Sequence, residues 1–259
     1  MRRKFGCLGW LVCLLAACDN PPPPPAAGSA PRPVVSAPTE AGPPSAVASA
    51  VVPIRKRKDP ASCPKEGPVG FDDPTLEAAI RRQLQKPTGP LARAELRKVK
   101  TLDLSQQARA DELDPCVFSQ LTGLKGLYLP ASDIDDLSPL RAAVNLESLR
   151  AAATTVTDLS PLSGLTKLER LDVGRTPVRD LKPLSKLTKL TELELDDTLV
   201  DDLSPLAHLE NLEVLLIKRT QVRDISPLKG MRKLKQLYIE DSLVKDVSPL
   251  TGIPGLKVH

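Results

Sequence analysis

The sequence predicts an α/β repeat solenoid, and three observations support this fold class. A block that reads Asp-Leu-Ser-Pro-Leu, or a close variant, recurs along the second half of the chain at a constant spacing of 22 residues. Apolar residues alternate with other residues between the blocks. Aromatic residues make up only 2% of the chain, so that leucine must fill the core repeatedly. Recurrence of this kind indicates units that stack on one another. The blocks begin at Asp136, Asp158, Asp180, Asp202, Asp224 and Asp246.

The segment between two blocks predicts a short strand. One copy places leucine at positions 190, 193 and 195, Thr198 after them, and Val200 at the end. Since Leu193 and Leu195 alternate with period two, both side chains point to the same, inward face. Stacked copies then form a parallel sheet with a continuous leucine core. The small hydroxyl residue after each strand can bond to backbone groups where the chain turns. These residues are Ser132, Thr154, Thr176, Thr198, Thr220 and Ser242.

The Ser-Pro pair of each block predicts a short helical or 3-10 turn on the side opposite the sheet. Serine is suited to the N-cap and proline to the first helical position. In the second copy Leu162, Leu165 and Leu168 supply the apolar side of this return segment. The aspartate that begins each block occupies the same place every time. We interpret it as a turn residue rather than a calcium ligand.

These motifs resemble the 22-residue leucine-rich repeats of the bacterial internalin type. The resemblance implies a horseshoe with a parallel sheet on the concave side, short helical or 3-10 segments on the convex side, and an N-terminal helical cap. The segment 71–80 resembles that cap, in which Asp73 caps a helix and Pro74 is its first residue. Residues Leu76, Ala79, Ile80 and Leu84 then cover the first leucine layer.

The two ends of the array are expected to be strands. The first contains Val99, Leu102 and Leu104. The segment Leu256–His259 begins another strand, which leaves a sheet edge open. That edge either frays, which we favour, or pairs with another chain.

The N-terminus resembles the signal of a bacterial lipoprotein. Met1–Lys4 is basic, residues 5–17 are apolar, and Leu15-Ala-Ala-Cys18 resembles a lipobox. The resemblance implies cleavage before Cys18 and attachment of a diacylglycerol to its thiol. The alternative is an ordinary secretion signal with an incidental cysteine. The sequence leaves the choice between inner and outer membrane open, so the expected location is the envelope, periplasmic or surface.

A proline- and alanine-rich tether follows the anchor. Its composition, which includes the unbroken run Pro21–Pro25, favours an extended spacer over a packed core. The basic residues 55–58 at its end either attract anionic lipid or simply form a solvated linker end, and we favour the second reading. The predicted divisions are a signal peptide at 1–17, an anchor and tether at 18–60, a cap at 61–98 and the repeats at 99–259.

Two cysteines remain for the folded part. Cys7 and Cys13 leave with the signal and Cys18 is acylated, so that Cys63 and Cys116 are the remaining thiols. Export places them in an oxidising compartment, where a pair can persist as a disulfide, and we expect this one to join the segment before the domain to its first repeats. The alternative is two unpaired cysteines, with Cys116 in the core.

Outward-facing strand residues are the candidate contacts with a protein partner. The row consists of Tyr128, Arg150, Asp172, Glu194, Leu216 and Tyr238. Neighbouring positions add Arg175, Asp196, Asp197, Lys218, Arg219, Glu240 and Asp241. Tyrosine and arginine are typical anchors of protein interfaces, and the resemblance implies that the concave face holds the partner. The alternative is a row of solvated positions without a ligand.

Other functions lack support in the sequence. The net charge is only +4 and no basic patch with stacking aromatics occurs, so nucleic acid is not expected as a partner. His208 and His259 lie outside any motif, and no nucleophile elbow, phosphate-binding glycine loop or cysteine cluster occurs. We therefore expect no catalysis, cofactor, metal or small-molecule substrate. The prediction is a lipid-anchored module that binds a protein in the envelope or outside the cell. The alternative is an envelope scaffold or spacer.

Overall fold

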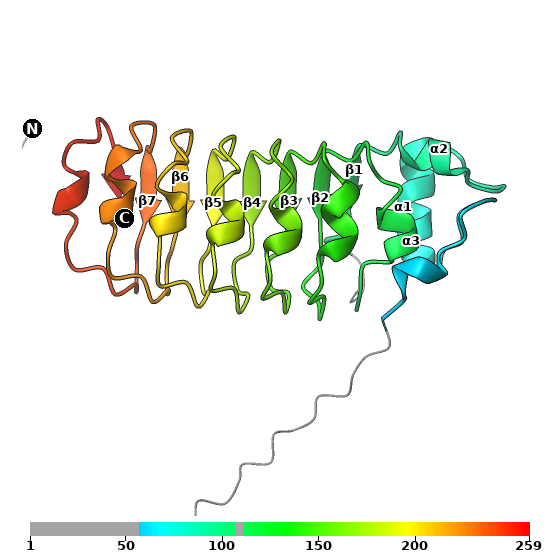
Figure 1. The fold of residues 1–259 in the computed structure, drawn as a ribbon, viewed down its shortest axis with the longest axis horizontal. Helices are drawn as coiled ribbons and strands as arrows, with labels where there is room; N and C mark the ends of the chain where they lie inside the picture. Colours follow the sequence, from blue (N-terminus) through cyan, green and yellow to red (C-terminus); the bar gives the residue numbers. More distant parts are fainter. Residues whose placement is uncertain (1–56, 107–110) are drawn as a thin grey trace, which may run out of the picture. The chain divides into compact units, whose positions relative to one another are not determined.

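A computed structural model describes residues 57–106 and 111–259 of the chain. The expected signal peptide, the acylation site at Cys18 and most of the expected tether lie outside these residues. Within the described part, strands and short helical segments alternate along the chain and stack side by side in one array (Figure 1).

Eight short strands form one parallel sheet, in which neighbours in the sequence are also neighbours in space. The strands are β1 (Thr101–Asp103), β2 (Gly126–Tyr128), β3 (Ser148–Arg150), β4 (Arg170–Asp172), β5 (Glu192–Glu194), β6 (Val214–Leu216), β7 (Gln236–Tyr238) and β8 (Lys257–Val258). The register places each repeat position opposite its counterpart, since Leu171 pairs with Leu193 and Leu193 with Leu215. This sheet confirms the predicted α/β repeat solenoid.

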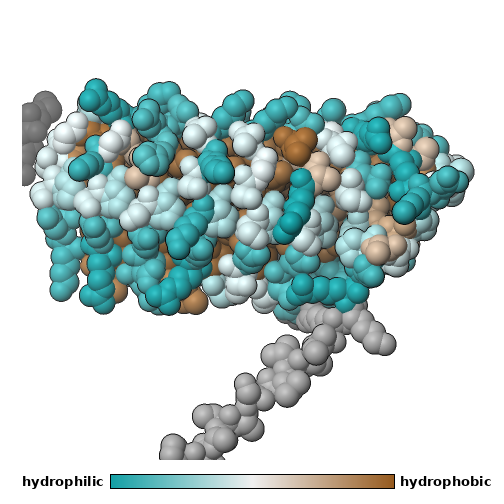
Figure 2. Space-filling model, in the orientation of Figure 1, coloured by the Kyte–Doolittle hydropathy of each residue, from teal (hydrophilic) through white to brown (hydrophobic). Residues whose placement is uncertain are grey.

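The core is a stack of leucine layers between the sheet and the return segments. Leu171, Leu193 and Leu215 point inward from the middle of their strands and are almost completely buried. The return segments contribute Leu162 and Leu165, which are also buried. Full burial of one such side chain stabilises a fold by roughly 1.5–3 kcal/mol, so that the repeated layers supply the main stabilising term. On the face shown in Figure 2, hydrophobic residues appear between more abundant hydrophilic ones, as expected for leucines packed inside the array.

Short 3-10 segments cross the side opposite the sheet. They are η2 (Ser138–Ala142), η3 (Ser160–Leu162), η4 (Lys182–Leu184), η5 (Ser204–Leu206), η6 (Ser226–Gly230) and η7 (Ser248–Leu250). The prediction that serine is the N-cap is wrong. The N-cap is the residue before it, such as Leu159 in η3, and serine or lysine is already the first residue of each segment. In η3, Asp158 Oδ1 accepts a hydrogen bond from the Ser160 amide at 2.8 Å, and Asp158 Oδ2 accepts one from the Ser160 hydroxyl at 2.7 Å. These two bonds close a turn in which the Asp158 side chain bonds to the residue two positions later. They confirm that the repeated aspartate is a turn residue.

The buried threonines act as the sequence predicts. The Thr198 hydroxyl donates to the carbonyl of Leu195 at 2.7 Å, and the equivalent bonds of Thr154, Thr176 and Thr220 measure 2.6–2.8 Å. The two serines of the series differ. The Ser132 hydroxyl is buried without a hydrogen-bond partner among the described residues, and Ser242 Oγ accepts a bond from Val244 N at 3.4 Å instead. The β-branch of threonine restricts its side chain to few rotamers, and serine lacks this restriction.

One residue in each middle repeat has a left-handed backbone without being glycine. The φ angles of these residues lie between 52° and 57°, and the residues are Ala153, Arg175, Asp197, Arg219 and Asp241. For a residue with a Cβ atom this conformation costs roughly 1–2 kcal/mol. The leucine layers on either side therefore hold a turn that the local sequence disfavours.

A helical cap covers the first layer. In α1 (Pro74–Leu84) the Asp73 side chain accepts a hydrogen bond from the Thr75 amide at 2.7 Å, and Leu76 and Ile80 are buried. The short helices α2 (Arg93–Leu96) and α3 (Pro115–Phe118) complete this end. The predicted cap helix and its buried face are confirmed. No helix within the described residues is long and apolar enough to cross a membrane.

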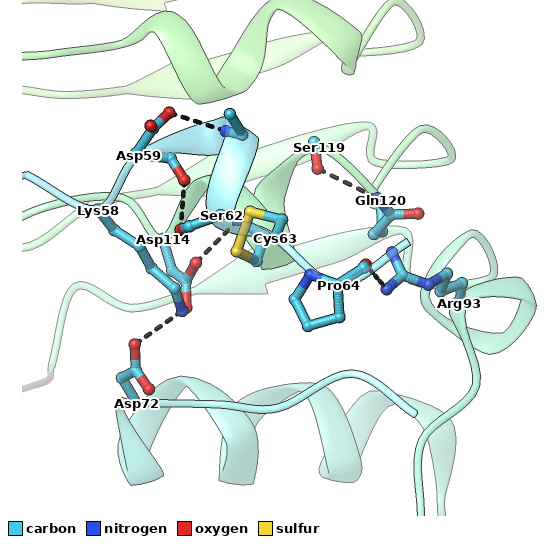
Figure 3. The surroundings of a disulfide bond; sticks show 12 residues. Lys58, Asp59, Ser62, Cys63, Pro64, Asp72, Arg93, Asp114, Ser119 and Gln120 are labelled. Atoms are coloured by element: carbon cyan, nitrogen blue, oxygen red, sulfur yellow. Dashed lines mark hydrogen bonds and ion pairs between the residues drawn. A yellow bond between two sulfur atoms is a disulfide. The ribbon is translucent and has the colours of Figure 1, made fainter. Parts of the chain in front are cut away.

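A disulfide joins Cys63, which follows the short 3-10 segment η1 (Pro60–Ser62), to Cys116 in α3 (Figure 3). It links the segment before the cap to the first repeats, as proposed from the sequence. Lys58 lies beside it, and its Nζ contacts Asp72 Oδ2 at 2.7 Å and Asp114 Oδ2 at 2.9 Å.

The segment that leads into η1 is attached to the domain by ion pairs. In addition to the Lys58 contacts, Arg57 Nη2 lies 2.6 Å from Asp135 Oδ2. The reading of residues 55–58 as a solvated linker end is therefore wrong for Lys58, whose side chain is only 26% exposed, whereas the Arg57 side chain stays 53% exposed. The carboxylates that pair with these two cations belong to Asp72, Asp114 and Asp135. They come from separate segments of the chain, so that no local sequence pattern predicts the pairing.

Candidate partner-binding face

The strand register brings the predicted contact residues together in one row. Each third strand position pairs with the third position of the next strand, so that Tyr128 lies opposite Arg150 and Leu216 opposite Tyr238. Parallel strands lie about 4.8 Å apart, which spaces the side chains closely across the sheet. We call Tyr128, Arg150, Asp172, Glu194, Leu216 and Tyr238 the outer row.

The structure adds a second row that the sequence reasoning missed. The first residue of each strand shares a face with the third, because side chains two apart in a strand point the same way. This second row contains Thr101, Gly126, Ser148, Arg170, Glu192, Val214, Gln236 and Lys257. The period-two pattern that located the outer row could have located it too.

Arg150 is held in place while much of its side chain stays accessible. Its Nε donates to Asp172 Oδ2 at 2.9 Å. The Asp172 side chain is only 13% exposed, whereas that of Arg150 is 54% exposed. Asp172 Oδ1 accepts a second bond from the Gly174 amide at 3.0 Å. A positioned but exposed guanidinium is suited to bidentate contacts with a partner.

The repeat of β5 carries a concentration of carboxylates. Burial raises the pKa of Glu194, and the nearby charges of Asp172 and Glu192 raise it further. Burial also raises the pKa of Asp196, although Asp196 Oδ1 accepts a bond from the Lys218 amide at 2.8 Å. Neither Glu192 nor Glu194 forms an ion pair within residues 57–106 and 111–259. The middle of the face is therefore negative.

The last outer-row residue is a fixed aromatic ring. Lys218 Nζ lies 4.8 Å from the ring centroid of Tyr238, and the ring of His259 stacks on Tyr238 with centroids 4.5 Å apart. Lys218 also forms an ion pair with Glu240 at 3.0 Å. These contacts restrict the motion of the Tyr238 ring.

The other predicted residues flank the outer row at the turns after the strands. Arg219 donates two hydrogen bonds to Asp197, at 2.5 and 2.6 Å, and this pairing raises the pKa of Arg219. Lys218 lies beside Tyr238, as described above. Arg175 has the left-handed backbone noted earlier. Within the part of the chain that the structure describes, no group of three or more His, Cys, Asp or Glu side chains is arranged to hold a metal ion.

A small depression on this face spans strands β2 to β5. It has a volume of about 180 Å³ and lies between Tyr128, Arg150, Arg170 and Glu194. This volume is below the 300–1,000 Å³ typical of small-molecule sites. The depression is therefore smaller than a typical small-molecule site.

Solved structures of other proteins have the same repeat architecture as this chain. An internalin of Listeria monocytogenes, inlF, matches with a TM-score of 0.66 and 30% identity over 73% of this chain. The chain spans 55% of that internalin's length. Internalin C2 of the same species matches with a TM-score of 0.61 and 28% identity over 73% of this chain and 93% of its own.

The chain is a leucine-rich-repeat solenoid. Its repeats are similar to those of internalins. A plant peptide hormone receptor, RGFR1, was solved in complex with RGF2 and shares the fold, with a TM-score of 0.56 and 18% identity over 64% of this chain and 28% of its own. No protein-family model matches the sequence, and a search of curated proteins found no match.

Proposed function

We propose that this leucine-rich-repeat protein is anchored in a bacterial envelope membrane and binds a protein partner through the outer row of its sheet. The observation that carries the proposal is the register. Six aligned strands present two tyrosines, an arginine and a leucine in one line. Tyrosine and arginine dominate the binding energy of protein interfaces.

The fixed positions of these side chains support the proposal. Asp172 holds Arg150, and Lys218 and His259 restrain Tyr238. Side chains that are ordered before binding lose less entropy when a partner arrives. The plant receptor with the same fold was solved in complex with RGF2, so that this architecture is compatible with ligand binding.

The anchoring part of the proposal rests on the N-terminal sequence. Basic residues, an apolar run and Leu15-Ala-Ala-Cys18 follow one another as in lipoprotein signals. With Cys18 acylated, the outer row would act close to the envelope, on the periplasmic side or at the surface.

A capture experiment with two matched variants tests the binding face. The full chain, purified in non-ionic detergent, is used as bait for envelope and secreted proteins of its host. In the test variant, Tyr128, Arg150 and Tyr238 are replaced by alanine. In the control variant, three exposed residues of the return segments, Lys186, Val144 and Arg232, are replaced by alanine.

The proposal expects a partner that the native and control baits retain and the test bait loses. Truncation of an interface anchor costs at least about 1–2 kcal/mol, so that three changes weaken binding by about a hundredfold or more. A partner retained equally by all three baits would favour a scaffold or spacer without a ligand on this face.

A further inference from the structure

A basic groove lies at the N-terminal end of the array, outside the outer row. It has a volume of about 610 Å³. Its walls are the segment around η1, the helices α2 and α3, and the 3-10 segment η2. The disulfide partner Cys63 and several prolines line it. Groove volumes of 300–1,000 Å³ are typical of sites for small molecules.

Among the described residues, four cationic side chains line this groove, namely Lys65, Arg93, Arg97 and Arg141, and none of the described Asp or Glu residues does. None of the four forms an ion pair within the described residues. Elsewhere on this domain six basic residues pair with carboxylates of neighbouring repeats, as Lys125 does with Glu147 at 2.7 Å. The groove therefore gathers four positive charges, of which Arg141 also faces the carboxylate of Asp158 closely enough to lower its pKa.

Arg93 supplies an independent sign of a missing acceptor. Its Nη2 donates to the carbonyl oxygen of Pro64, which fixes the guanidinium beside the residue that follows Cys63 (Figure 3). Its Nε is buried and has no hydrogen-bond partner among the described residues. A buried donor without an acceptor costs roughly 1–3 kcal/mol, and an anion oxygen that reached the Nε from the groove would remove that cost.

We propose that the basic groove binds a phosphate group. Arginine guanidinium groups are matched in geometry to phosphate oxygens. A phosphate group is charged at neutral pH, with one negative charge as a diester and about −1.5 to −2 as a monoester, and its oxygens can accept bonds from several of the four cations at once. The disulfide and the prolines hold the walls in place before the ligand arrives, and this preorganisation favours affinity.

Titration calorimetry on the full chain, purified in non-ionic detergent, tests this proposal. The probes are inorganic phosphate, the soluble phosphodiester glycerophosphoglycerol, and acetate. Arg97→Gln with Arg141→Gln removes two exposed groove cations, and Arg93→Lys keeps a positive charge while removing the guanidinium fork. The matched control is Arg223→Gln with Arg232→Gln, which removes two exposed arginines from distant repeats.

The proposal expects binding of at least one phosphate probe, weakened about tenfold by either groove variant and unchanged in the control. Inorganic phosphate alone would identify a free phosphate as the source, and the diester alone would identify a lipid or polymer head group. Absence of binding by both phosphate probes would overturn the proposal. Equal binding by acetate, or equal loss in the control variant, would overturn it as well.

Discussion

The disulfide between Cys63 and Cys116 offers a prediction whose magnitude follows from the structure. The bond closes a loop with a sequence separation of 53 residues. In the chain-entropy treatment, a loop of this length removes entropy from the unfolded chain that corresponds to about 4 kcal/mol at 25 °C. Loss of the bond should therefore lower the free energy of unfolding of the N-terminal end of the array by about 4 kcal/mol.

Urea denaturation, followed by circular dichroism, measures this change. With a urea m-value of about 2–3 kcal/mol/M, the midpoint should fall by about 1.5 M. Two forms are compared with the oxidised native chain: the native chain under reductant, and the chain with Cys63→Ala and Cys116→Ala. Cys116 is buried, so that the double variant also loses the packing of one sulfur atom. The reduced native chain isolates the effect of the bond itself.

The control is the double variant under reductant, whose midpoint should not move. Oxidised and reduced native chains that unfold at the same urea concentration would refute the reasoning. In that case the contacts of Lys58 with Asp72 and Asp114 would suffice to hold the cap on the repeats.

Three further outcomes are expected. Ala153→Gly, at a φ of 55°, should raise the free energy of unfolding by about 0.5–1 kcal/mol, whereas Ala152→Gly beside it should lower it by a similar amount; an equal loss in both would exclude strain at residue 153. In the folded chain, the pKa of the Asp158 and Asp202 carboxyls lies below its ordinary value, mainly because the following serine hydroxyl donates to the carboxylate and also because the serine amide does. The stabilisation from these turns is therefore present above about pH 4 and is lost as pH falls through the folded pKa. Asp158→Asn with Asp202→Asn should make the melting temperature depend less on pH below pH 4. A melting temperature that falls with acid as steeply as in the native chain would contradict this. Cys18→Ala should abolish labelling by a palmitate analogue in the cell; labelling that persists would exclude acylation at this residue.

The repeat architecture could be predicted because each of its rules is local and recurs. The Asp158 turn, the Thr198 hydroxyl bond and the inward Leu193 all follow from residues a few positions apart. The serine cap failed as a prediction because Ser160 donates its hydroxyl to Asp158 rather than accepting a backbone bond. Both arrangements use the same residue types at the same spacing.

Other features arise only when distant segments meet. The left-handed backbone falls on alanine, arginine or aspartate, so that no glycine marks it in the sequence. The basic groove combines Lys65, Arg97 and Arg141 from three separate segments, and each residue alone resembles an ordinary surface cation. The sequence predicted no small-molecule substrate. The proposed phosphate site depends on residues that only the fold brings together, so that no sequence motif predicts it.

Site-specific photo-cross-linking tests the binding face most directly. A photoreactive amino acid is placed either at Leu216, in the outer row, or at Val144, which is 50% exposed and follows η2 on the return side. Both proteins are irradiated with the partner captured by the native bait. The proposed binding face predicts a covalent adduct from position 216 and none from position 144. Adducts from position 144 alone, or in equal yield from both positions, would contradict it.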